Sequence, residues 1–241
     1  MALIQVQDAA FSYDGKHMIF QHLNLQAREG EILCIIGPNG CGKSTLIDCL
    51  LGLNKLNAGA IFINEKPVER LKPRELAEQM AYVPQGHRTT FAYTVLDVVT
   101  MGRTYASKTF SPPGKEQQDI ARDALHQVGL AGFEEREYTR LSGGELQLVL
   151  IARAIAQQSK LLIMDEPTAA LGARQQALVY QTMRAAANKN LGVMVISHDI
   201  PKMLEVSDRI CIMRQGNVIA DLVSKETNLQ TVLSLMLTGQ A

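Results

Sequence analysis

Three short runs of apolar residues mark the predicted core of the chain. Each run is continuous and rich in β-branched residues, and each is followed by glycine, acidic or Ser-His-Asp residues. Continuous apolar runs of this length are typical of parallel strands that are buried on both faces. The three predicted strands are residues 32–36, 161–164 and 193–196. Other segments alternate apolar and polar positions instead, which predicts antiparallel strands at 4–6, 10–13, 23–25 and 60–64.

Helical patterns lie between the predicted buried strands, so we predict an α/β protein. The glycine, acidic and Ser-His-Asp residues come directly after the ends of these strands, which is where open α/β sheets bind their ligands. The pattern changes after residue 86, where helical segments are broken at 111–114 and 129–132. The predicted division is one domain, 1–241, with a core of 1–85 and 159–241 and an inserted helical subdomain of 86–158.

Composition narrows the class of protein. With 46% hydrophobic residues the chain has ample material for a buried core, and its 24 basic and 24 acidic residues give no net charge. A neutral chain has no overall field that attracts nucleic acid, so no nucleic-acid partner is expected. The N-terminal residues lack the pattern of a secretory signal, and no apolar run approaches the roughly 20 residues that span a bilayer. Any membrane role is therefore expected to be peripheral, with the membrane-spanning part on another chain.

A glycine-rich loop, Gly-Pro-Asn-Gly-Cys-Gly-Lys-Ser-Thr, follows the first buried strand and precedes an apolar helical stretch at 46–51. This is the context that a P-loop requires, because its backbone N–H groups and the positive helix N-terminus surround the phosphates of a nucleotide. Lys43 supplies a charge for the β- and γ-phosphates, and the Ser44 hydroxyl can bind Mg²⁺. A chance glycine-rich turn before a capped helix is the alternative. The predicted ATP-binding residues here are Gly37, Asn39, Gly40, Cys41, Gly42, Lys43, Ser44 and Thr45.

The four cysteines show neither CxxC spacing nor histidine partners, which favours reduced thiols in a cytosolic compartment. Three of them surround the glycine-rich loop, which a disulfide would distort. Cys41 lies inside the loop, where oriented backbone N–H groups and Lys43 are expected to favour the thiolate. We therefore expect a thiol alkylator to inhibit the protein and ATP to protect Cys41.

The apolar run at 161–164 ends in two adjacent carboxylates, Asp165 and Glu166. Burying one carboxylate is costly, and burying two requires a cation or a proton. The pair is therefore predicted to be functional. An acidic turn at the end of a strand is the alternative.

The pentapeptide Leu-Ser-Gly-Gly-Glu at 141–145 is the most informative motif in the chain. Two glycines after a serine let the backbone approach an anion, and the helical run at 148–156 directs its N-terminus at that anion. A serine-capped helix start is the simpler alternative. Together with the P-loop and the carboxylate pair, the pentapeptide resembles the signature motif of ABC-type ATPases. This resemblance covers nearly the whole chain and implies a P-loop NTPase fold with a RecA-like core, an N-terminal antiparallel β subdomain and an inserted α-helical subdomain.

The resemblance implies a role for each motif. By likeness to the Walker B motif, Asp165 would face Mg²⁺ and Glu166 would polarise the attacking water. Gln85 resembles the Q-loop residue that touches Mg²⁺ or water. His198 resembles the switch histidine at the γ-phosphate, with a core or capping histidine as the alternative. Tyr13 resembles the aromatic residue that stacks on adenine, with a buried strand tyrosine as the alternative.

In this family the signature closes over the ATP of a second subunit, so the resemblance implies a homodimer. The residues that would cap the partner's γ-phosphate are Ser142, Gly143 and Gly144. Two positions depart from the family pattern. Glu145 stands where glutamine is usual, and we expect its side chain to point away from the triphosphate. Gly172 stands where an aspartate is usual, which leaves open how tightly the two ATP sites are coupled.

Chain length and one further stretch indicate the biological role. A single core of 241 residues, without a second core or a long heptad insert, fits a stand-alone subunit of a multi-chain transporter. Residues 91–103 resemble the corresponding stretch of metal-chelate importers, the iron-siderophore, haem, cobalamin and molybdate group, with an amphipathic helix start as the alternative. The resemblance implies a peripheral ATPase at the cytoplasmic face of a bacterial inner membrane, bound to a polytopic permease dimer and served indirectly by a substrate-binding protein. Zinc or manganese importers, exporters and soluble non-transport ATPases are the alternatives.

Overall fold

The computed structural model describes residues 2–86, 92–106 and 114–239. The centre of the protein is a six-stranded sheet in the order β10-β9-β3-β8-β7-β6. Five of these strands are parallel, and β10 pairs antiparallel with β9 at one edge. They are β3 (Ile32–Ile36), β6 (Met80–Val83), β7 (Leu161–Asp165), β8 (Gly192–Ile196), β9 (Arg209–Arg214) and β10 (Asn217–Val223). The three continuous apolar runs are therefore buried parallel strands, as the sequence predicts.

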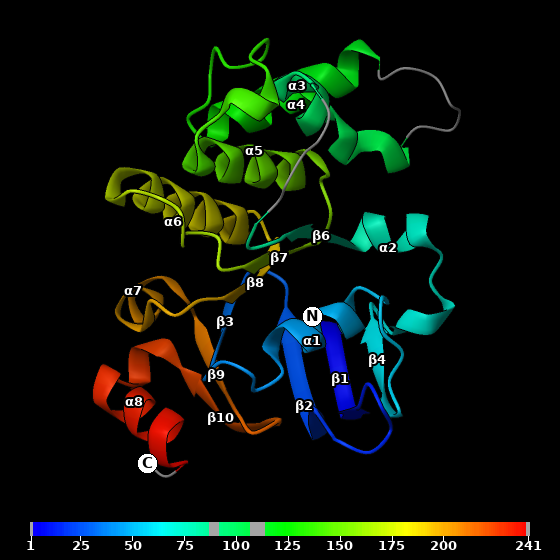
Figure 1. The fold of residues 1–241 in the computed structure, drawn as a ribbon, viewed down its shortest axis with the longest axis vertical. Coiled ribbons are helices and arrows are strands. Elements are labelled where there is room, and N and C mark those ends of the chain that lie inside the picture. Colours follow the sequence, from blue (N-terminus) through cyan, green and yellow to red (C-terminus); the bar gives the residue numbers. More distant parts are fainter. Residues whose placement is uncertain (1, 87–91, 107–113, 240–241) are drawn as a thin grey trace.

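A four-stranded antiparallel sheet, in the order β2-β1-β4-β5, lies beside the central sheet (Figure 1). Its strands are β1 (Ala2–Phe11), β2 (Phe20–Arg28), β4 (Ala58–Ile63) and β5 (Lys66–Pro67). The sequence predicts two separate segments at 4–6 and 10–13, but β1 is one strand that ends at Phe11. Its pairing with β2 shifts register between Val6 and Ala9, where Asp8 has a φ of 46°. Such an irregularity interrupts the alternation of a strand without ending it.

Most of the helices pack around the central sheet or lie beyond it (Figure 1). Within the described residues the α-helices are α1 (Lys43–Leu50), α2 (Pro73–Gln79), α3 (Val95–Thr100), α4 (Lys115–Gln127), α5 (Gly143–Ala156), α6 (Ala173–Asn188), α7 (Ile200–Val206) and α8 (Leu229–Thr238). The 3₁₀ helices are η1 (Val68–Arg70), η2 (Met101–Ala106), η3 (Tyr138–Arg140) and η4 (Ser224–Glu226). None of these helices combines the length and the apolar character needed to cross a membrane.

The described elements between residues 95 and 156 are all helices, and they gather at one end of the molecule (Figure 1). Of the two breaks expected in this region, one is a turn between α4 and α5. Gly129 and Gly132 lie there with φ values of 74° and 83°, which glycine adopts without strain. Of the other expected break, at 111–114, only Gly114 is described, as the residue that precedes α4.

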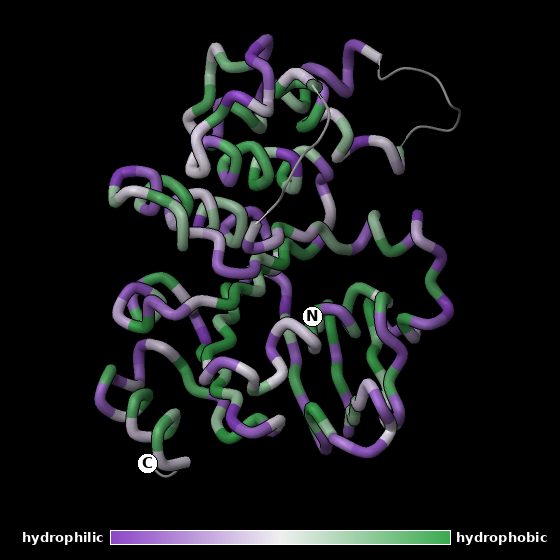
Figure 2. The backbone as a smooth tube through the Cα atoms, in the orientation of Figure 1, coloured by the Kyte–Doolittle hydropathy of each residue, from purple (hydrophilic) through white to green (hydrophobic). Residues whose placement is uncertain are grey.

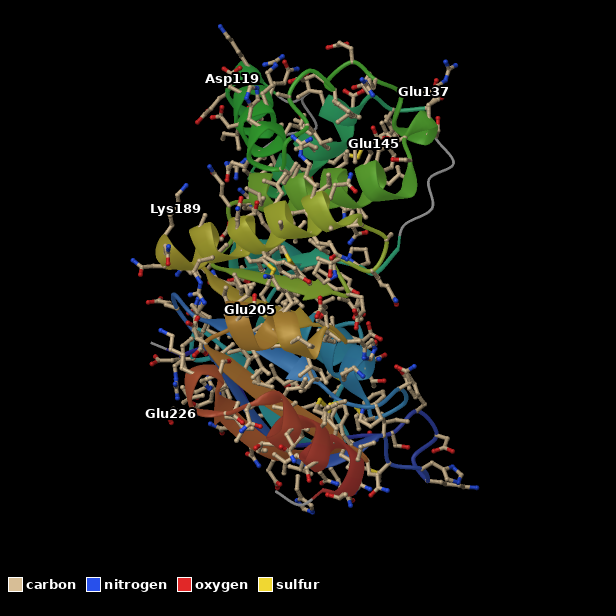
Figure 3. All side chains as sticks on the ribbon, turned by 90° about the vertical axis from the view of Figure 1, so that its left-hand side faces the viewer. Asp119, Glu137, Glu145, Lys189, Glu205 and Glu226 are labelled. Carbon is tan, nitrogen blue, oxygen red and sulfur yellow. The ribbon has the colours of Figure 1, made fainter. Side chains whose placement is uncertain are left out.

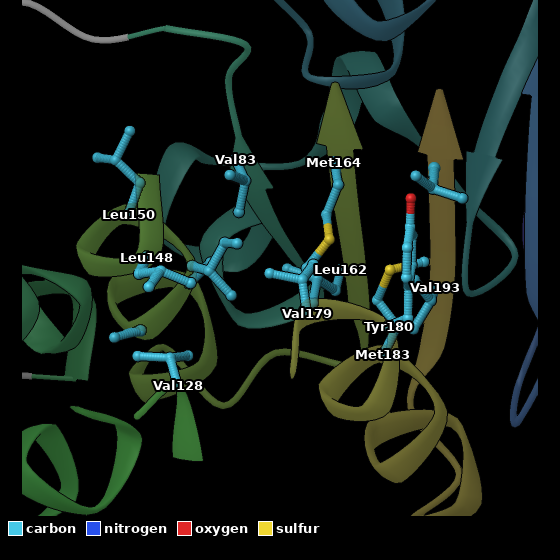
Figure 4. Close-up of a cluster of buried hydrophobic side chains, with 14 of the residues drawn as sticks. Val83, Val128, Leu148, Leu150, Leu162, Met164, Val179, Tyr180, Met183 and Val193 are labelled. Atoms are coloured by element: carbon cyan, nitrogen blue, oxygen red, sulfur yellow. The ribbon is translucent and has the colours of Figure 1, made fainter. Parts of the chain in front are cut away.

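The central sheet separates two apolar cores. On β3, Ile32 and Cys34 pack on one side and Leu33 and Ile35 on the other, because successive side chains of a strand point to opposite faces. Side chains from α5 and α6 meet β6, β7 and β8 in the first core (Figure 4). Helix α1 and the antiparallel sheet contribute to the second core. In Figure 2 the strands at the centre of the molecule are largely green, the colour of hydrophobic residues.

Charged side chains lie mainly on the outside. Asp119 on α4, Lys189 after α6 and Glu205 on α7, which are labelled in Figure 3, are exposed. Helix α8 is an exception to this division. Its helical period predicts packing against the core, and Val232 and Leu235 are buried, but an apolar side of the helix remains at the surface. The exposed side chains there are Leu229, Leu233 and Leu237.

Candidate nucleotide-binding and hydrolysis site

The glycine-rich loop connects the end of β3 to the start of α1. Gly40 and Gly42 have φ values of 78° and 102°, a left-handed region that favours glycine. Lys43 is the first residue of α1 and is 7% exposed. Its ammonium group donates hydrogen bonds to the Gly37 and Pro38 carbonyls at 2.8 and 3.0 Å. The loop therefore surrounds a positive charge at a helix N-terminus, an arrangement that suits a phosphate.

Gly37 brings the loop into contact with the central sheet. A Cβ atom on Gly37 would lie 2.1 Å from the Met213 carbonyl oxygen and 2.8 Å from Cys41 Sγ, so a larger residue does not fit. Cys41 itself is buried in the core beneath the loop. The sequence suggests a reactive thiol beside the phosphates, but the Cys41 side chain is enclosed by its neighbours. Only the backbone of Cys41 is left to face a phosphate.

A cleft of about 630 Å³ lies against this loop. It is lined by most of the residues that the sequence analysis selects: Asn39, Gly40, Gly42, Lys43, Ser44, Thr45, Gln85, Asp165, Glu166 and His198. Ile19 and Ile196 complete the lining. Ile196 ends a predicted strand, whereas no signal in the sequence pattern selects Ile19. The other selected residues lie outside the lining of the cleft: Tyr13, Gly37, Cys41, Ser142, Gly143 and Gly144.

Asp165 is the last residue of β7 and is 8% exposed. The Ser44 hydroxyl donates a hydrogen bond to Asp165 Oδ2 at 3.4 Å, which joins the phosphate-binding loop to β7. Burial raises the pKa of Asp165 above its ordinary value of 3.8, while the Ser44 hydrogen bond and the Lys43 charge oppose that rise. A carboxylate beside a hydroxyl supplies the hard oxygen atoms that Mg²⁺ prefers. The described residues contain no cluster of three or more His, Cys, Asp or Glu side chains suited to a metal.

Glu166 follows Asp165 and has a φ of 46°, an uncommon conformation for a residue with a side chain. Its carboxylate is buried, and burial raises the pKa of Glu166 above its ordinary value of 4.5, with attraction to His198 as the main opposing effect. His198 Nε2 lies 3.2 Å from Glu166 Oε1, although that oxygen accepts no aligned hydrogen bond within the described structure. The His198 side chain is 53% exposed and Asp199 caps the next helix, so the alternatives of a core or capping histidine are wrong.

Gln85 lies just beyond β6. The carbonyl of the preceding residue, Pro84, accepts a hydrogen bond from Gln147 Nε2 at 3.3 Å. Gln147 belongs to α5 and is buried. The segment that carries Gln85 is therefore attached to the helix that begins at the signature motif.

Tyr13 lies two residues beyond β1 and is 65% exposed. Its hydroxyl is 3.4 Å from Thr45 Oγ1, and its ring meets Phe11 edge-on with the ring centres 4.8 Å apart. The alternative of a buried strand tyrosine is therefore wrong. The ring is accessible beside the end of the phosphate-binding loop, from where it can stack on a base.

The signature residues cap α5. The Ser142 hydroxyl donates to Glu145 Oε2 at 2.6 Å and accepts from the Glu145 backbone at 3.4 Å, while the Ser142 backbone donates to the same carboxylate at 2.8 Å. This is a capping box, and the S-x-x-E spacing is the signal that predicts it. The hydrogen bonds from Ser142 lower the pKa of Glu145. Around Gly143 there is open space where a Cβ atom would lie, whereas Gly144 packs against Gln175.

Gly172 begins α6 as its N-cap. Its backbone N–H donates to Gln175 Oε1 at 3.3 Å. Glycine has no side chain that could accept from the first N–H groups of the helix, as an aspartate at this position would.

The stretch that resembles metal-chelate importers packs tightly on α5. Its first residue, Phe91, lies outside the described residues. Thr94 begins α3 through a capping box with Asp97. Arg103 donates to the Gln157 carbonyl at 3.0 Å. These contacts are those of a capped, buried helix start. A helix start is the alternative to the importer resemblance that the sequence analysis gives for residues 91–103.

The loop between β3 and α1 and the carboxylates after β7 define a P-loop nucleoside triphosphatase. A family model described as ABC transporter matches residues 20–169, more than half of the chain. The chain therefore belongs to the ABC transporter family. It is an ATP-hydrolysing cassette of that family, and the predicted fold class and ATPase activity are confirmed.

Similar proteins carry different transport functions in their descriptions. An uncharacterized ABC transporter ATP-binding protein of Haemophilus influenzae is 40% identical over 88% of this chain and 81% of that protein. The molybdate import ATP-binding protein MolC of the same species is 36% identical over 89% of this chain and 80% of that protein. The manganese transport system ATP-binding protein MntB of Listeria monocytogenes is 34% identical over 88% of this chain and 87% of that protein.

Solved structures share the fold over almost the whole chain. An inward-facing ABC transporter assigned to the metal-chelate type matches with a TM-score of 0.84 and 32% identity, over 98% of this chain and 89% of that chain. A dimeric structure of a bacterial ABC transporter cassette matches with a TM-score of 0.83 and 26% identity, over 92% of this chain and 99% of that chain.

Proposed function

We propose that this chain is the ATPase subunit of an ABC importer and that two copies work as a head-to-tail dimer. The observation that carries the proposal is the buried Glu166 carboxylate, whose Oε1 lies 3.2 Å from His198 beside the phosphate-binding loop. Phosphoryl transfer needs little covalent chemistry from a protein, so positioning and charge stabilisation supply most of the catalysis. The buried Glu166 base, His198 and Lys43 line one cleft and would provide both the positioning and the charge stabilisation.

The phosphate-binding loop would hold the triphosphate. Backbone N–H groups of the loop would surround the phosphates, joined by the side chains of Asn39 and Thr45. The Lys43 ammonium now bonded to the Gly37 carbonyl would turn to the β- and γ-phosphates, which attract it more strongly than neutral carbonyls do. The exposed ring of Tyr13 would stack on adenine.

The residues at the end of β7 fit Mg²⁺. Ser44, Asp165 and Gln85 line the cleft and carry side-chain oxygen atoms, and Ser44 and Asp165 are already in contact. Three such side chains leave room for phosphate oxygens and water, which is how proteins usually bind this ion. When bound, Mg²⁺ would neutralise negative charge on the phosphates.

Glu166 would orient and polarise the attacking water. Its raised pKa makes the carboxylate a better proton acceptor than an exposed glutamate, as a general base requires. His198, with its side chain half exposed in the same cleft, would contact the γ-phosphate. Because the two side chains lie close together, both would act at the same γ-phosphate and its attacking water.

The dimer proposal rests on the signature residues. Ser142, Gly143 and Gly144 form a helix N-terminus that does not line the cleft of their own chain. A helix N-terminus with an open glycine suits an anion brought by another molecule. The 26%-identical cassette solved as a dimer supports the formation of a dimer. Each chain would then cap the γ-phosphate of its partner's ATP.

The proposed transporter imports a metal chelate or a metal oxyanion, of the iron-siderophore, haem, cobalamin or molybdate type. Support comes from the molybdate import relative and from the metal-chelate type structure. In this proposal the chain is bacterial, lies at the cytoplasmic face of the inner membrane, binds a polytopic permease dimer, and acts with a substrate-binding protein. A manganese- or zinc-type importer is the second candidate, favoured by the manganese relative.

Co-purification followed by transport tests this role. The tagged chain is isolated in mild detergent, its membrane partner is identified, and the complex is reconstituted in vesicles with ATP inside. We expect ATP-dependent movement of a ferric siderophore, haem, cobalamin or molybdate, and none with Glu166→Gln. Transport of manganese or zinc alone would replace the first candidate by the second. Recovery of ribosomal or DNA fragments without a membrane partner would refute both.

A further inference from the structure

A buried tyrosine hydroxyl connects the two segments that follow Glu166 and His198. Tyr180 Oη lies 3.3 Å from Thr168 Oγ1 and 3.4 Å from Asp199 Oδ2. Tyr180 and Thr168 are each 5% exposed, so the bond between them is shielded from solvent, whereas Asp199 is exposed. In Figure 4 the hydroxyl of Tyr180 points along β7 and β8 toward their carboxyl ends.

The direction of these hydrogen bonds follows from the groups. Burial raises the pKa of Tyr180, so its hydroxyl keeps its proton at neutral pH. An ionised carboxylate only accepts, so Tyr180 donates to Asp199 and accepts from the Thr168 hydroxyl. The result is a chain of two bonds that runs from Thr168 through Tyr180 to Asp199.

Both ends of this chain are tied to the hydrolytic residues. At one end, Thr168 belongs to a turn in which the Ala169 backbone donates to the Glu166 carbonyl at 3.2 Å. At the other end, Asp199 is adjacent to His198, and its Oδ1 accepts from the Lys202 backbone at 3.2 Å at the start of α7. Asp199 therefore uses one carboxylate oxygen for the helix start and the other for Tyr180.

We propose that Tyr180 is a positioning residue for ATP hydrolysis, since its hydroxyl holds the turn after Glu166 and the segment after His198 in a fixed relation. That relation sets the 3.2 Å approach of His198 Nε2 to Glu166 Oε1. Tyr180 does not line the cleft beside the phosphate-binding loop, so its effect on hydrolysis would be indirect. The inference rests on the proposed function, because it assumes the roles given there to Glu166 and His198.

Tyr180→Phe is the direct test, because it keeps the buried ring and removes only the hydroxyl. We expect kcat for ATP hydrolysis to fall about three- to tenfold, because the net free energy of one weak hydrogen bond corresponds to a change of this size. KM for ATP and the melting temperature should not change. The matched control is Tyr105→Phe. The Tyr105 hydroxyl donates to the Gln157 carbonyl at 2.7 Å, outside the cleft, so kcat should stay at the wild-type value.

Thr168→Val removes the other hydroxyl of the chain at nearly constant volume. If the two bonds act as one connection, the effects of the two substitutions should not be independent. The fold-loss of kcat in the Thr168→Val, Tyr180→Phe double variant should then be smaller than the product of the fold-losses in the two single variants. An unchanged kcat in Tyr180→Phe would overturn the inference. So would fully multiplicative losses, or a loss that merely follows the fraction of unfolded protein.

Glu166→Gln separates this inference from the proposed function. Wild-type turnover by Glu166→Gln would remove the assigned role of Glu166, whatever Tyr180→Phe does. Loss of turnover in Glu166→Gln together with full activity in Tyr180→Phe would leave the proposed function intact and refute only the positioning role.

Discussion

Nε2 of His198 lies 3.2 Å from Oε1 of Glu166, although the two residues follow different strands. The approach is a product of sheet order, because β7 and β8 are neighbours and Asp165 pairs with Ile196. The Glu166 backbone also donates to the Ile196 carbonyl at 3.0 Å. Two polar side chains distant in sequence are thereby brought to one point beside the phosphate-binding loop.

Glu166→Gln is expected to bind ATP and to lose turnover by at least about 100-fold, because an amide cannot accept the proton of the attacking water. Steady-state hydrolysis and equilibrium binding of ATP measure the two effects separately. The variant should also accumulate as a dimer with ATP in size-exclusion chromatography. Glu226→Gln, an exposed change on η4, serves as the control and should hydrolyse ATP normally. Near-normal turnover by Glu166→Gln would contradict the assignment.

The same variant should be more stable than the wild type when nucleotide and Mg²⁺ are absent. Because burial raises the folded-state pKa of Glu166, the folded chain binds its proton more tightly than the unfolded chain does. The charged carboxylate therefore lowers stability as pH rises above its ordinary pKa of 4.5. Thermal melts should show a stabilising effect of Glu166→Gln at neutral pH that shrinks as the pH approaches that value. A stabilising effect that does not change with pH would show that burial does not disfavour the charged form of Glu166.

Gly143→Ala tests the signature without damaging the fold. Nothing lies within 4 Å of the added Cβ and no positive φ opposes it, so the melting temperature should not fall. Turnover should drop about 100-fold if a partner's γ-phosphate must approach this backbone, while ATP binding by the monomer stays intact. A fully active Gly143→Ala enzyme would argue against a phosphate at this point.

Ser142→Ala is expected to abolish turnover as well, but it also removes a helix cap that contributes about 1 kcal/mol. Thr94→Ala provides the matched control, because Thr94 forms the same kind of capping box at α3. Unfolding experiments should show similar losses of stability in both variants. Only Ser142→Ala should lose hydrolysis, and equal losses of activity would reduce the role of Ser142 to capping.

The four thiols should resist a disulfide reagent in the native protein. All four are buried, and burial raises the pKa of Cys49 and of Cys211 to about 12 and that of Cys34 still further. We expect each to react at least about 100-fold more slowly than in denaturant, because the thiolate is the reactive form. Colorimetric thiol titration with and without denaturant measures this. If one thiol reacted rapidly in the native protein and ATP slowed that reaction, the result would support the expectation from the sequence that Cys41 is reactive.

Gly37→Ala should destabilise the protein by about 1 to 3 kcal/mol, since its Cβ would overlap the Met213 carbonyl and the loop would have to move. Denaturant unfolding gives the loss directly, and ATP affinity should fall with it. Gly86→Ala is the matched control because the space around Gly86 is open.

The sequence predicts three strands of the central sheet and most of the cleft because these depend on local signals, but it does not predict β6, β9 and β10. Continuous apolar runs identify β3, β7 and β8, and the polar residues after them identify the loop, Asp165, Glu166 and His198. The division of β1 into two strands fails because a bulge at Asp8 interrupts the alternation. Burial of Cys41 and the position of Ile19 depend on contacts with residues far along the chain, which no local pattern reports.

The strand that bears the phosphate-binding loop lies between β8 and β9, both of which come from the last third of the chain. The Ile32 backbone donates to Asp208 Oδ2 at 2.8 Å, and Gly37 rests on the Met213 carbonyl. During synthesis the loop therefore leaves the ribosome long before the strands that hold it in shape. A nascent chain that stops before Arg209 would contain every residue of the phosphate-binding motif and still lack the strand on which Gly37 rests.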